Sequence, residues 1–196
     1  MLNNLLYQIK RYGIIGTVRF AIDKFTSLIF YGPNVLIRNP NYIRVSGKLI
    51  LGKRFSSGPG LILDVFKDGR LDIGENVKMN HRVHIGVVSS VKIGNNSLFA
   101  SNILIIDHNH GVYRGDRQSK PDEIPLKRIL DSKPINIGSG VWVGENVCIL
   151  PGVSIGDNSI VSAGAVVTKN MPSDSIIAGN PAKVVKKWID TSWVEN

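Results

Sequence analysis

The sequence has little cysteine, few aromatic residues and no long apolar run. Cys148 is its only cysteine, so a disulfide within the chain is excluded and a cytosolic setting fits. Nowhere do about 18 apolar residues follow one another, so we expect no transmembrane helix. The first residues lack the charged stretch, apolar core and cleavage site of a signal peptide. We therefore expect a cytoplasmic protein.

Positive charge is plentiful, but the sequence motifs of nucleic-acid binding are missing. The formal net charge is +9, which attracts anions such as nucleic acid, phospholipid surfaces and phosphorylated cofactors. Zinc-finger spacing, an aromatic RNP-like strand and a convincing helix-turn-helix are absent. We therefore expect no nucleic-acid partner. A specific anion site and a merely solvated basic surface both stay open.

What the sequence does contain is a six-residue repeat. An aliphatic residue recurs at every sixth position, at Ile137, Val143, Ile149, Ile155, Val161 and Val167. Glycine or asparagine recurs near the expected turns, at Gly140, Asn146, Gly152, Asn158 and Gly164. These two residue types tolerate turn conformations that β-branched residues do not. The pattern is typical of many tight turns between short strands.

A weaker copy of the repeat lies upstream. It occupies Ile73, Met79, Ile85 and Val91 and, after a slip of two residues, Ile93, Phe99 and Ile105. A period of six matches neither a helix face nor a simple hairpin, but it matches coils of three short strands, about 18 residues each. We expect Ile137 to stack on Ile155, Val143 on Val161 and Ile149 on Val167. Because one coil cannot bury its own inner face, stacked coils must share a core.

With this repeat the chain resembles the hexapeptide-repeat acyltransferases over roughly residues 50–188. It is most similar to the O-acetyltransferases of lipopolysaccharide and polysaccharide biosynthesis, of the WbbJ type. The resemblance implies an all-β fold, a left-handed parallel β-helix over residues 36–175 with a loop excursion at residues 108–134. Residues 1–35 would form a helical cap or extension, and residues 176–196 a capping segment with a helix. It also implies a homotrimer with active sites between subunits.

The two ends of the chain lie outside the regular repeat. Leu5, Leu6, Ile9 and Tyr12 have helical spacing with basic residues among them, which predicts one or two short amphipathic helices within residues 1–31. Such helices can cover the open edge of the first coil or contact a membrane surface, and both interpretations stay open.

At the other end, the stretch from Ala178 to Lys183 closely matches the family's terminal segment. That match implies a capping helix at residues 182–189, with Pro181 near its first turn.

Acetyl transfer to a hydroxyl needs a base, and a histidine, with a reference pKa of about 6.5, is the usual one. The candidates are His81, His84, His108 and His110. Aligned from Ile93, the galactoside and maltose acetyltransferases place their catalytic histidine at His110, with His108 as the alternative. Asp107 is predicted to orient a histidine, and a surface-turn aspartate is the competing interpretation.

Two side chains are candidates for binding the acceptor. Asn80 matches a family position that hydrogen-bonds the acceptor sugar, and Trp142 matches a position beside the active site. Alternatively, Asn80 is a turn residue and Trp142 packs against another subunit. Val88 stands where the family has an acceptor-binding aspartate, so we expect an acceptor other than a simple galactoside. A sugar, a sugar nucleotide and a lipid-linked oligosaccharide all stay open.

The resemblance implies acetyl-CoA as co-substrate and requires no metal. Small residues let a pantetheine arm approach the backbone, and lysines suit the nucleotide phosphates. The matching positions are Ala163, Gly164, Thr168, Lys169, Lys183 and Lys186. Ordinary surface charge is the competing interpretation of the lysines.

Other functions also stay open. A γ-carbonic-anhydrase-like enzyme holds zinc with three histidines, but its H-x₄-H pair is absent from this sequence. A non-catalytic scaffold is a second alternative, and a serine, drug or amino-sugar acceptor is a third. We predict an acetyl-CoA-dependent O-acetyltransferase that modifies a sugar hydroxyl in lipopolysaccharide, O-antigen or other surface polysaccharide biosynthesis.

Overall fold

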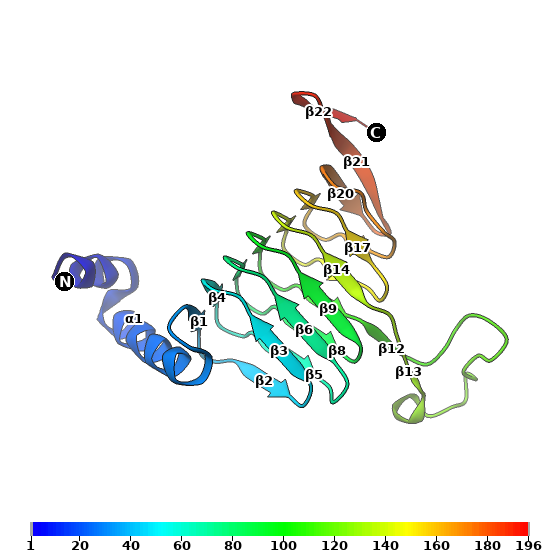
Figure 1. Cartoon of the computed structure of the whole chain (residues 1–196), viewed down its shortest axis with the longest axis horizontal. Helices are drawn as coiled ribbons and strands as arrows, with labels where there is room; N and C mark the ends of the chain where they lie inside the picture. The colour runs from blue at the N-terminus through cyan, green and yellow to red at the C-terminus, as the bar shows by residue number, and fades with distance from the viewer. Residues whose placement is uncertain (1, 196) are drawn as a thin grey trace.

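The repeat folds as a parallel β-helix whose coils stack along one axis (Figure 1). The computed structural model describes the backbone of residues 2–195 and the side chains of residues 6–195. Met1, Asn196 and the side chain of Leu5, which belong to the predicted end segments, lie outside the described residues. Within the described residues, three sheets form the walls of the β-helix, and tight turns form its corners.

Each wall is one sheet, named here A, B or C. Sheet A runs in the order β1 (Val35–Ile37), β4 (Phe55–Ser57), β7 (Lys78–Met79), β10 (Leu98–Phe99), β15 (Trp142–Val143), β18 (Ile160–Val161), β20 (Ser175–Gly179), β21 (Ala182–Ile189) and β22 (Ser192–Glu195). Sheet B runs β2 (Tyr42–Val45), β5 (Ile62–Val65), β8 (His84–Val87), β11 (Leu104–Ile106), β16 (Cys148–Ile149) and β19 (Val166–Val167). Sheet C runs β3 (Lys48–Leu51), β6 (Arg70–Ile73), β9 (Ser90–Ile93), β14 (Ile135–Ile137) and β17 (Ser154–Ile155).

The inward stacking that the repeat predicts is confirmed. The pairs in register are Ile137 with Ile155, Val143 with Val161 and Ile149 with Val167. These side chains are at most 3% exposed. Burial of each contributes about 1.5–3 kcal/mol to the free energy of folding. One continuous apolar core therefore runs along the axis.

The two-residue slip upstream has a structural cause. Ile73 pairs with Ile93 and Ile85 with Ile105, so these coils are longer by two residues. The extra residues lie at the corner between sheets B and C, where Val87 adds one more buried side chain. The B–C corner is therefore wider in the upstream coils.

A long helix, α1 (Leu2–Tyr31), precedes the β-helix and breaks at Gly13, where φ is 68° and ψ is 177°. Beyond the break, the Oγ of Ser27 accepts a hydrogen bond from the backbone N–H of Ile37 (2.8 Å) and donates to its carbonyl (3.2 Å). Buried Asp23 accepts from the backbone N–H of Asn39 at 3.0 Å. The helix thus occupies the open edge of β1, as a cap does. The N-terminal end of α1 lies away from the coils (Figure 1), while Tyr12, just before the break, packs against the guanidinium of Arg38, which lies 5.0 Å from its ring centroid.

Membrane crossing by α1 is not indicated. Among the residues that the structure describes, no helix has both the length and the apolarity that a membrane span requires.

The predicted C-terminal helix at residues 182–189 is wrong. These residues form β21, which pairs antiparallel with β20 and then with β22. Gly179, with a φ of 98°, stands at the turn. Val184 and Val185 favour a strand, and the free edge of sheet A offers them a partner. The resemblance thus gave this segment the wrong secondary structure.

The loop excursion leaves the B–C corner as a hairpin. Its strands are β12 (His108–His110) and β13 (Leu130–Ser132), which pair antiparallel. A 3-10 turn, η1 (Pro125–Lys127), lies in the loop between them. The N–H of Lys133 donates to the carbonyl of Asp107 at 2.7 Å and closes the base of the hairpin. The β-helix then resumes at β14.

Candidate active site

His110 lies at the end of β12, and its side chain is exposed. Two residues of the loop hold the backbone of His110 in place through hydrogen bonds. Tyr113 Oη donates to the carbonyl of His110 at 2.6 Å, and Arg128 Nη1 donates to Tyr113 Oη at 2.9 Å. Arg128 Nη2 also donates to the carbonyls of Lys120, Pro121 and Glu123. The loop around His110 is therefore held by one guanidinium.

Sequence reasoning missed Tyr113 and Arg128. Both lie where the repeat is interrupted, so no periodic signal marks them. The one usable signal was the presence of a tyrosine in a polar, proline-containing loop. Such a side chain has few apolar neighbours to pack against, so its hydroxyl is expected to form a hydrogen bond.

Asp107 is fully buried, so its interpretation as a surface-turn residue is wrong. Its carboxylate accepts the backbone N–H of Val88 at 2.8 Å and of Ser89 at 2.7 Å. Its Oδ1 also lies 3.1 Å from Nδ1 of His108. The structure therefore pairs the predicted orienting residue with His108 and not with His110.

His108 stands between two other rings. Its side chain is only 11% exposed. Its ring centroid lies 5.8 Å from that of Phe66 and 6.2 Å from that of His110, edge to face in both cases. Asp107, His108 and His110 thus form one contiguous cluster at the B–C corner.

Most of the other candidates lie elsewhere on the same chain. Asn80 is exposed just after β7, and Ala163 and Gly164 form the turn between β18 and β19, so all three belong to the A–B corner. Trp142 points outward from sheet A and is 50% exposed. The structure therefore does not bring these residues to the histidine cluster within one subunit.

The A–B corner suits the approach of a thin ligand. Gly164 has a φ of +73°, and a Cβ at this position would meet nothing within 4 Å. Gly164 and the small Ala163 beside it are exposed, and the N–H of Gly164 donates to the carbonyl of Glu145 at 2.8 Å. This is the environment in which an extended chain can bond to backbone groups.

The lysine candidates are divided between two places. Thr168 and Lys169 follow β19 and are exposed, and Lys183 is exposed on β21. Lys186, also on β21, places its Nζ 2.8 Å from a carboxylate oxygen of Glu195. Lys169 and Lys183 are both exposed, whereas the ammonium group of Lys186 already has an acidic partner.

The histidines do not form a metal centre within the described chain. His81 lies at the A–B corner and His84 on sheet B, whereas His108 and His110 lie on the hairpin. Over residues 2–195, no group of three His, Cys, Asp or Glu side chains is placed to hold a metal ion.

Known proteins share both the repeat and the fold. The family described as bacterial transferase hexapeptide (six repeats) matches residues 134–169. WbbJ of Escherichia coli K12, provisionally described as a lipopolysaccharide biosynthesis O-acetyl transferase, is 43% identical over 91% of this chain and 92% of its own length. Galactoside O-acetyltransferase of the same organism is 37% identical over 60% of this chain and 54% of its own.

Solved structures agree with these relatives. A maltose O-acetyltransferase from Clostridium difficile 630 is 30% identical, with a TM-score of 0.63 over 73% of this chain and 71% of that one. A galactoside acetyltransferase in complex with coenzyme A is 29% identical, with a TM-score of 0.54 over 73% and 74%. The repeat and the β-helix define a hexapeptide-repeat transferase. More narrowly, because WbbJ matches along nearly the whole of both chains, this chain belongs to the hexapeptide-repeat O-acetyltransferases.

Proposed function

We propose that this protein transfers the acetyl group of acetyl-CoA to a hydroxyl of a sugar unit, during biosynthesis of lipopolysaccharide or another surface polysaccharide. The observation that carries the proposal is the 43% identity with WbbJ along 91% of the chain. The exposed His110 on its anchored hairpin supplies the matching chemistry. The acceptor is a sugar, a sugar nucleotide or a lipid-linked oligosaccharide.

His110 is the proposed general base. Bound acetyl-CoA supplies an acetyl group activated as a thioester. The imidazole of His110 takes the proton of the acceptor hydroxyl as that oxygen attacks the thioester carbonyl. The C–S bond then breaks, and the imidazolium returns the proton to the departing thiolate of CoA. Tyr113 fixes the backbone of His110, and the ring of His108, held by Asp107, restricts where the ring of His110 can lie. His108 is the alternative base, since Asp107 already orients its ring.

The cofactor positions are proposed from their exposure and size. The A–B corner lets the pantetheine arm bond to the backbone, and the lysines face the phosphates. The residues are Ala163, Gly164, Thr168, Lys169, Lys183 and Lys186. Lys186 would have to share its ammonium with Glu195. Asn80 and Trp142 are the proposed acceptor contacts.

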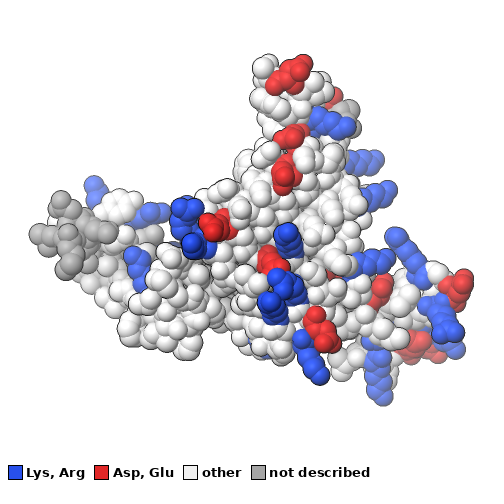
Figure 2. Space-filling model, viewed as in Figure 1, with Lys and Arg blue, Asp and Glu red and all other residues white. Residues whose placement is uncertain are grey.

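The outer faces of the β-helix support a homotrimer. Outward residues of sheet A are apolar at Leu98, Trp142, Ile160 and Ile176 and basic at Lys78. Those of sheet B are apolar at Ile62, Leu104, Cys148 and Val166 and polar at Arg44, Asp64 and His84. Those of sheet C are mostly polar, at Lys48, Arg70, Asp72, Lys92, Asn136 and Ser154, and Figure 2 shows both signs of charge over this face. A cyclic trimer requires two different complementary patches on each subunit.

We therefore propose that sheet A of one subunit packs against sheet B of the next. This arrangement lets His110 of one subunit act beside Trp142 and Gly164 of its neighbour. The histidine cluster and the candidates at the A–B corner, which lie apart within one chain, would then meet between two subunits.

A peripheral membrane contact through α1 is also proposed. After Gly13 the helix exposes apolar side chains at Ile14, Ile15, Val18, Ile22, Phe25 and Ile29. Its exposed charges are basic, at Lys10, Arg11, Arg19 and Lys24, and its buried Asp23 binds Asn39. Apolar and basic side chains together suit an anionic lipid surface, such as the inner face of the cytoplasmic membrane.

Vesicle sedimentation tests this contact. The protein should sediment with phosphatidylglycerol vesicles and not with phosphatidylcholine vesicles, and Phe25→Glu should abolish the binding. Recovery of the protein in the supernatant with both lipids would contradict it.

The function itself is tested by release of free thiol from acetyl-CoA. The acceptors are free sugars, sugar nucleotides and extracted lipid-linked oligosaccharides, each supplied alone. Acceptor-dependent thiol release, with an acetyl ester detected on the sugar by mass spectrometry, supports the proposal and identifies the acceptor class. Release without an acetylated sugar in every case would contradict it.

A further inference from the structure

A cluster of basic and aromatic side chains lies at the break in α1. Because the helix changes direction there, Tyr12 lies against Phe20, and the two rings stack with centroids 5.6 Å apart. The guanidinium of Arg38, from the first coil, lies over both rings, 5.0 Å from that of Tyr12 and 5.2 Å from that of Phe20. Arg11 lies 5.2 Å from the ring of Tyr12. Lys24 lies 4.8 Å from the ring of Phe20. Three cations therefore gather around two adjacent rings.

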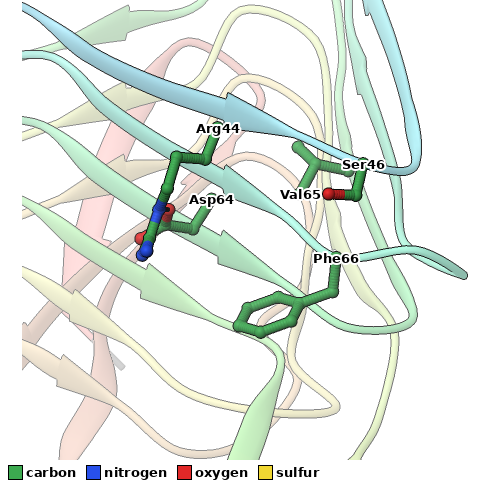
Figure 3. A pocket seen from close by; sticks show the side chains of 5 residues that line it. All are labelled: Arg44, Ser46, Asp64, Val65 and Phe66. Carbon is green, nitrogen blue, oxygen red and sulfur yellow. Dashed lines mark hydrogen bonds and ion pairs between the residues drawn. The ribbon is translucent and has the colours of Figure 1, made fainter.

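The cations of this cluster have no acidic partner. Among the side chains that the structure describes, no carboxylate forms an ion pair with Arg11, Lys24 or Arg38. Arg44, on the strand that follows Arg38, differs in this respect, because its Nε donates to Asp64 at 2.6 Å (Figure 3). A guanidinium that lies over a ring uses its flat face and keeps its N–H donors at the edge. The cluster therefore offers both positive charge and hydrogen-bond donors to an anion.

The one acidic residue of α1 is bonded on the other side of the helix. Asp23 is buried, and its Oδ1 accepts the backbone N–H of Asn39 at 3.0 Å and the Nδ2 of Asn39 at 2.9 Å. Lys24 instead is exposed and precedes Phe25, whose exposed ring is one of the apolar side chains proposed to contact a membrane. An anion at the cluster would therefore lie beside the apolar face of α1.

We propose that this cluster binds the diphosphate of a lipid-linked acceptor at the membrane surface. Guanidinium and ammonium groups bind phosphate oxygens through charge-assisted hydrogen bonds, and a diphosphate has enough charge and oxygens to engage all three cations. The lipid part of the same molecule would join the apolar side chains of α1 in the bilayer. This inference rests on the proposed sugar acetyltransferase function and deepens it, because it selects one class of acceptor.

The height of the cluster in the β-helix decides which sugar ring can react. Arg38 directly precedes β2, whereas the hairpin with His110 follows β11, three strands further along sheet B. Neighbouring strands are about 4.8 Å apart, so the two sites are separated by about 14 Å along the axis. Coils that pack side by side keep this separation between subunits. A single sugar ring is shorter, so the acetylated ring is not the one attached to the diphosphate. The acceptor is therefore a lipid-linked oligosaccharide and not a sugar nucleotide.

Three substitutions separate the cluster from the general positive charge of the protein. Arg38→Gln and Lys24→Gln each remove one cation of the cluster and keep the rings. Arg54→Gln is the matched control, because Arg54 is an exposed arginine beside β4, near the same end of the β-helix. Among the described residues, Arg54 forms neither an ion pair nor a contact with a ring.

The first experiment measures binding of the full chain to vesicles. Phosphatidylcholine vesicles carry either a polyprenyl diphosphate or phosphatidylglycerol, at equal negative charge. The wild type and Arg54→Gln should bind the diphosphate vesicles about tenfold more tightly, and Arg38→Gln and Lys24→Gln should lose this preference. Equal binding of the wild type to both vesicles, or a preference that survives both substitutions, would overturn the site.

A soluble diphosphate distinguishes the lipid-linked acceptor from a sugar nucleotide. UDP-glucose, at the concentration of the polyprenyl diphosphate, should leave the protein bound to the diphosphate vesicles. Displacement of the protein by UDP-glucose would assign the cluster to a soluble nucleotide and overturn the lipid-linked acceptor.

The second experiment compares one oligosaccharide acceptor with and without its lipid diphosphate. For the lipid-linked form, Arg38→Gln should raise the acceptor KM about tenfold and leave the KM for acetyl-CoA at the wild-type value. For the free oligosaccharide, Arg38→Gln and the wild type should have equal KM values, because the group that Arg38 binds is missing. A rise with both forms would indicate general damage and overturn the site. If no acceptor is acetylated but the vesicle preference behaves as expected, the proposed function fails and the diphosphate site stands.

Discussion

The carboxylate of Asp107 holds the imidazole of His108, with Oδ1 3.1 Å from Nδ1. The same carboxylate accepts the backbone N–H groups of Val88 and Ser89 from the preceding coil. One buried acid thus ties the hairpin to the β-helix and orients the ring that packs beside His110. His110 itself is positioned indirectly, through His108 and through Tyr113.

Loss of the Asp107 carboxylate should destabilise the fold. Asp107→Asn weakens charge-assisted hydrogen bonds at a fully buried site, which should lower the free energy of unfolding by about 1–3 kcal/mol. Urea denaturation measures it. Asp157→Asn is the control, because exposed Asp157 likewise accepts one backbone N–H, from Ser139 at 2.7 Å. An equal loss of unfolding free energy in the two variants would contradict the prediction that the buried carboxylate of Asp107 contributes more to stability than an exposed one.

Tyr113 should act as a positioning residue. Tyr113→Phe removes the hydrogen bond to the carbonyl of His110 and the acceptor of Arg128 Nη1. We expect kcat to fall by about tenfold, with the melting temperature and the KM for acetyl-CoA unchanged, because only the hairpin loosens. Tyr7→Phe, on α1, should leave all three values at wild type. A Tyr113→Phe enzyme with wild-type kcat would contradict this role.

Assembly should depend on the outer face of sheet A. Leu98→Asp places a charge on that face, and Ile50→Asp places one on sheet C; the two side chains are 43% and 40% exposed in the single chain. Analytical ultracentrifugation should show a trimer for the wild type and Ile50→Asp and smaller species for Leu98→Asp, because a charge buried at an interface lacks a partner. A trimer with Leu98→Asp would place the interface elsewhere.

The Arg44–Asp64 pair gives a prediction on pH. The hydrogen bond from Arg44 lowers the pKa of Asp64 from its ordinary value of 3.8. A depressed carboxylate pKa stabilises the fold at pH values above the unfolded pKa, about 3.9, and that contribution is lost as pH falls through the folded value. The free energy of unfolding should therefore fall more steeply below about pH 4 for the wild type than for Arg44→Gln. If the unfolding free energies of the two proteins fall in parallel below about pH 4, the Arg44–Asp64 pair contributes nothing to stability.

Much of the fold follows from the repeat. The spacing of Ile137, Val143 and Ile149 predicted their stacking partners, since an inward residue in a solenoid must lie on the next inward residue. Asn146 and Asn158 marked turns and do adopt positive φ, at 59° and 56°. These features are local and periodic, so sequence alone encodes them.

The remaining features depend on partners that are distant in the sequence. β21 is a strand because sheet A ends with a free edge, and the strand propensity of Val184 and Val185 alone does not reveal that partner. Asp107 pairs with His108 because its carboxylate also accepts the backbone N–H of Val88 in the preceding coil, and this contact fixes the position of the carboxylate. Phe66 lies outside every motif, and only the stacking of coils brings its ring beside that of His108.

The most direct test of the account is the turnover of His110→Ala and His108→Ala beside the wild type, in the thiol-release assay with the best acceptor. His110→Ala should lose about 10²–10⁴-fold in kcat and still bind CoA by calorimetry. His108→Ala should lose less, because its ring only positions the base, and His81→Ala, at the A–B corner, should match the wild type. If His110→Ala turns over at the wild-type rate while His108→Ala is inactive, the base is His108. Wild-type rates in both would contradict histidine catalysis at this hairpin.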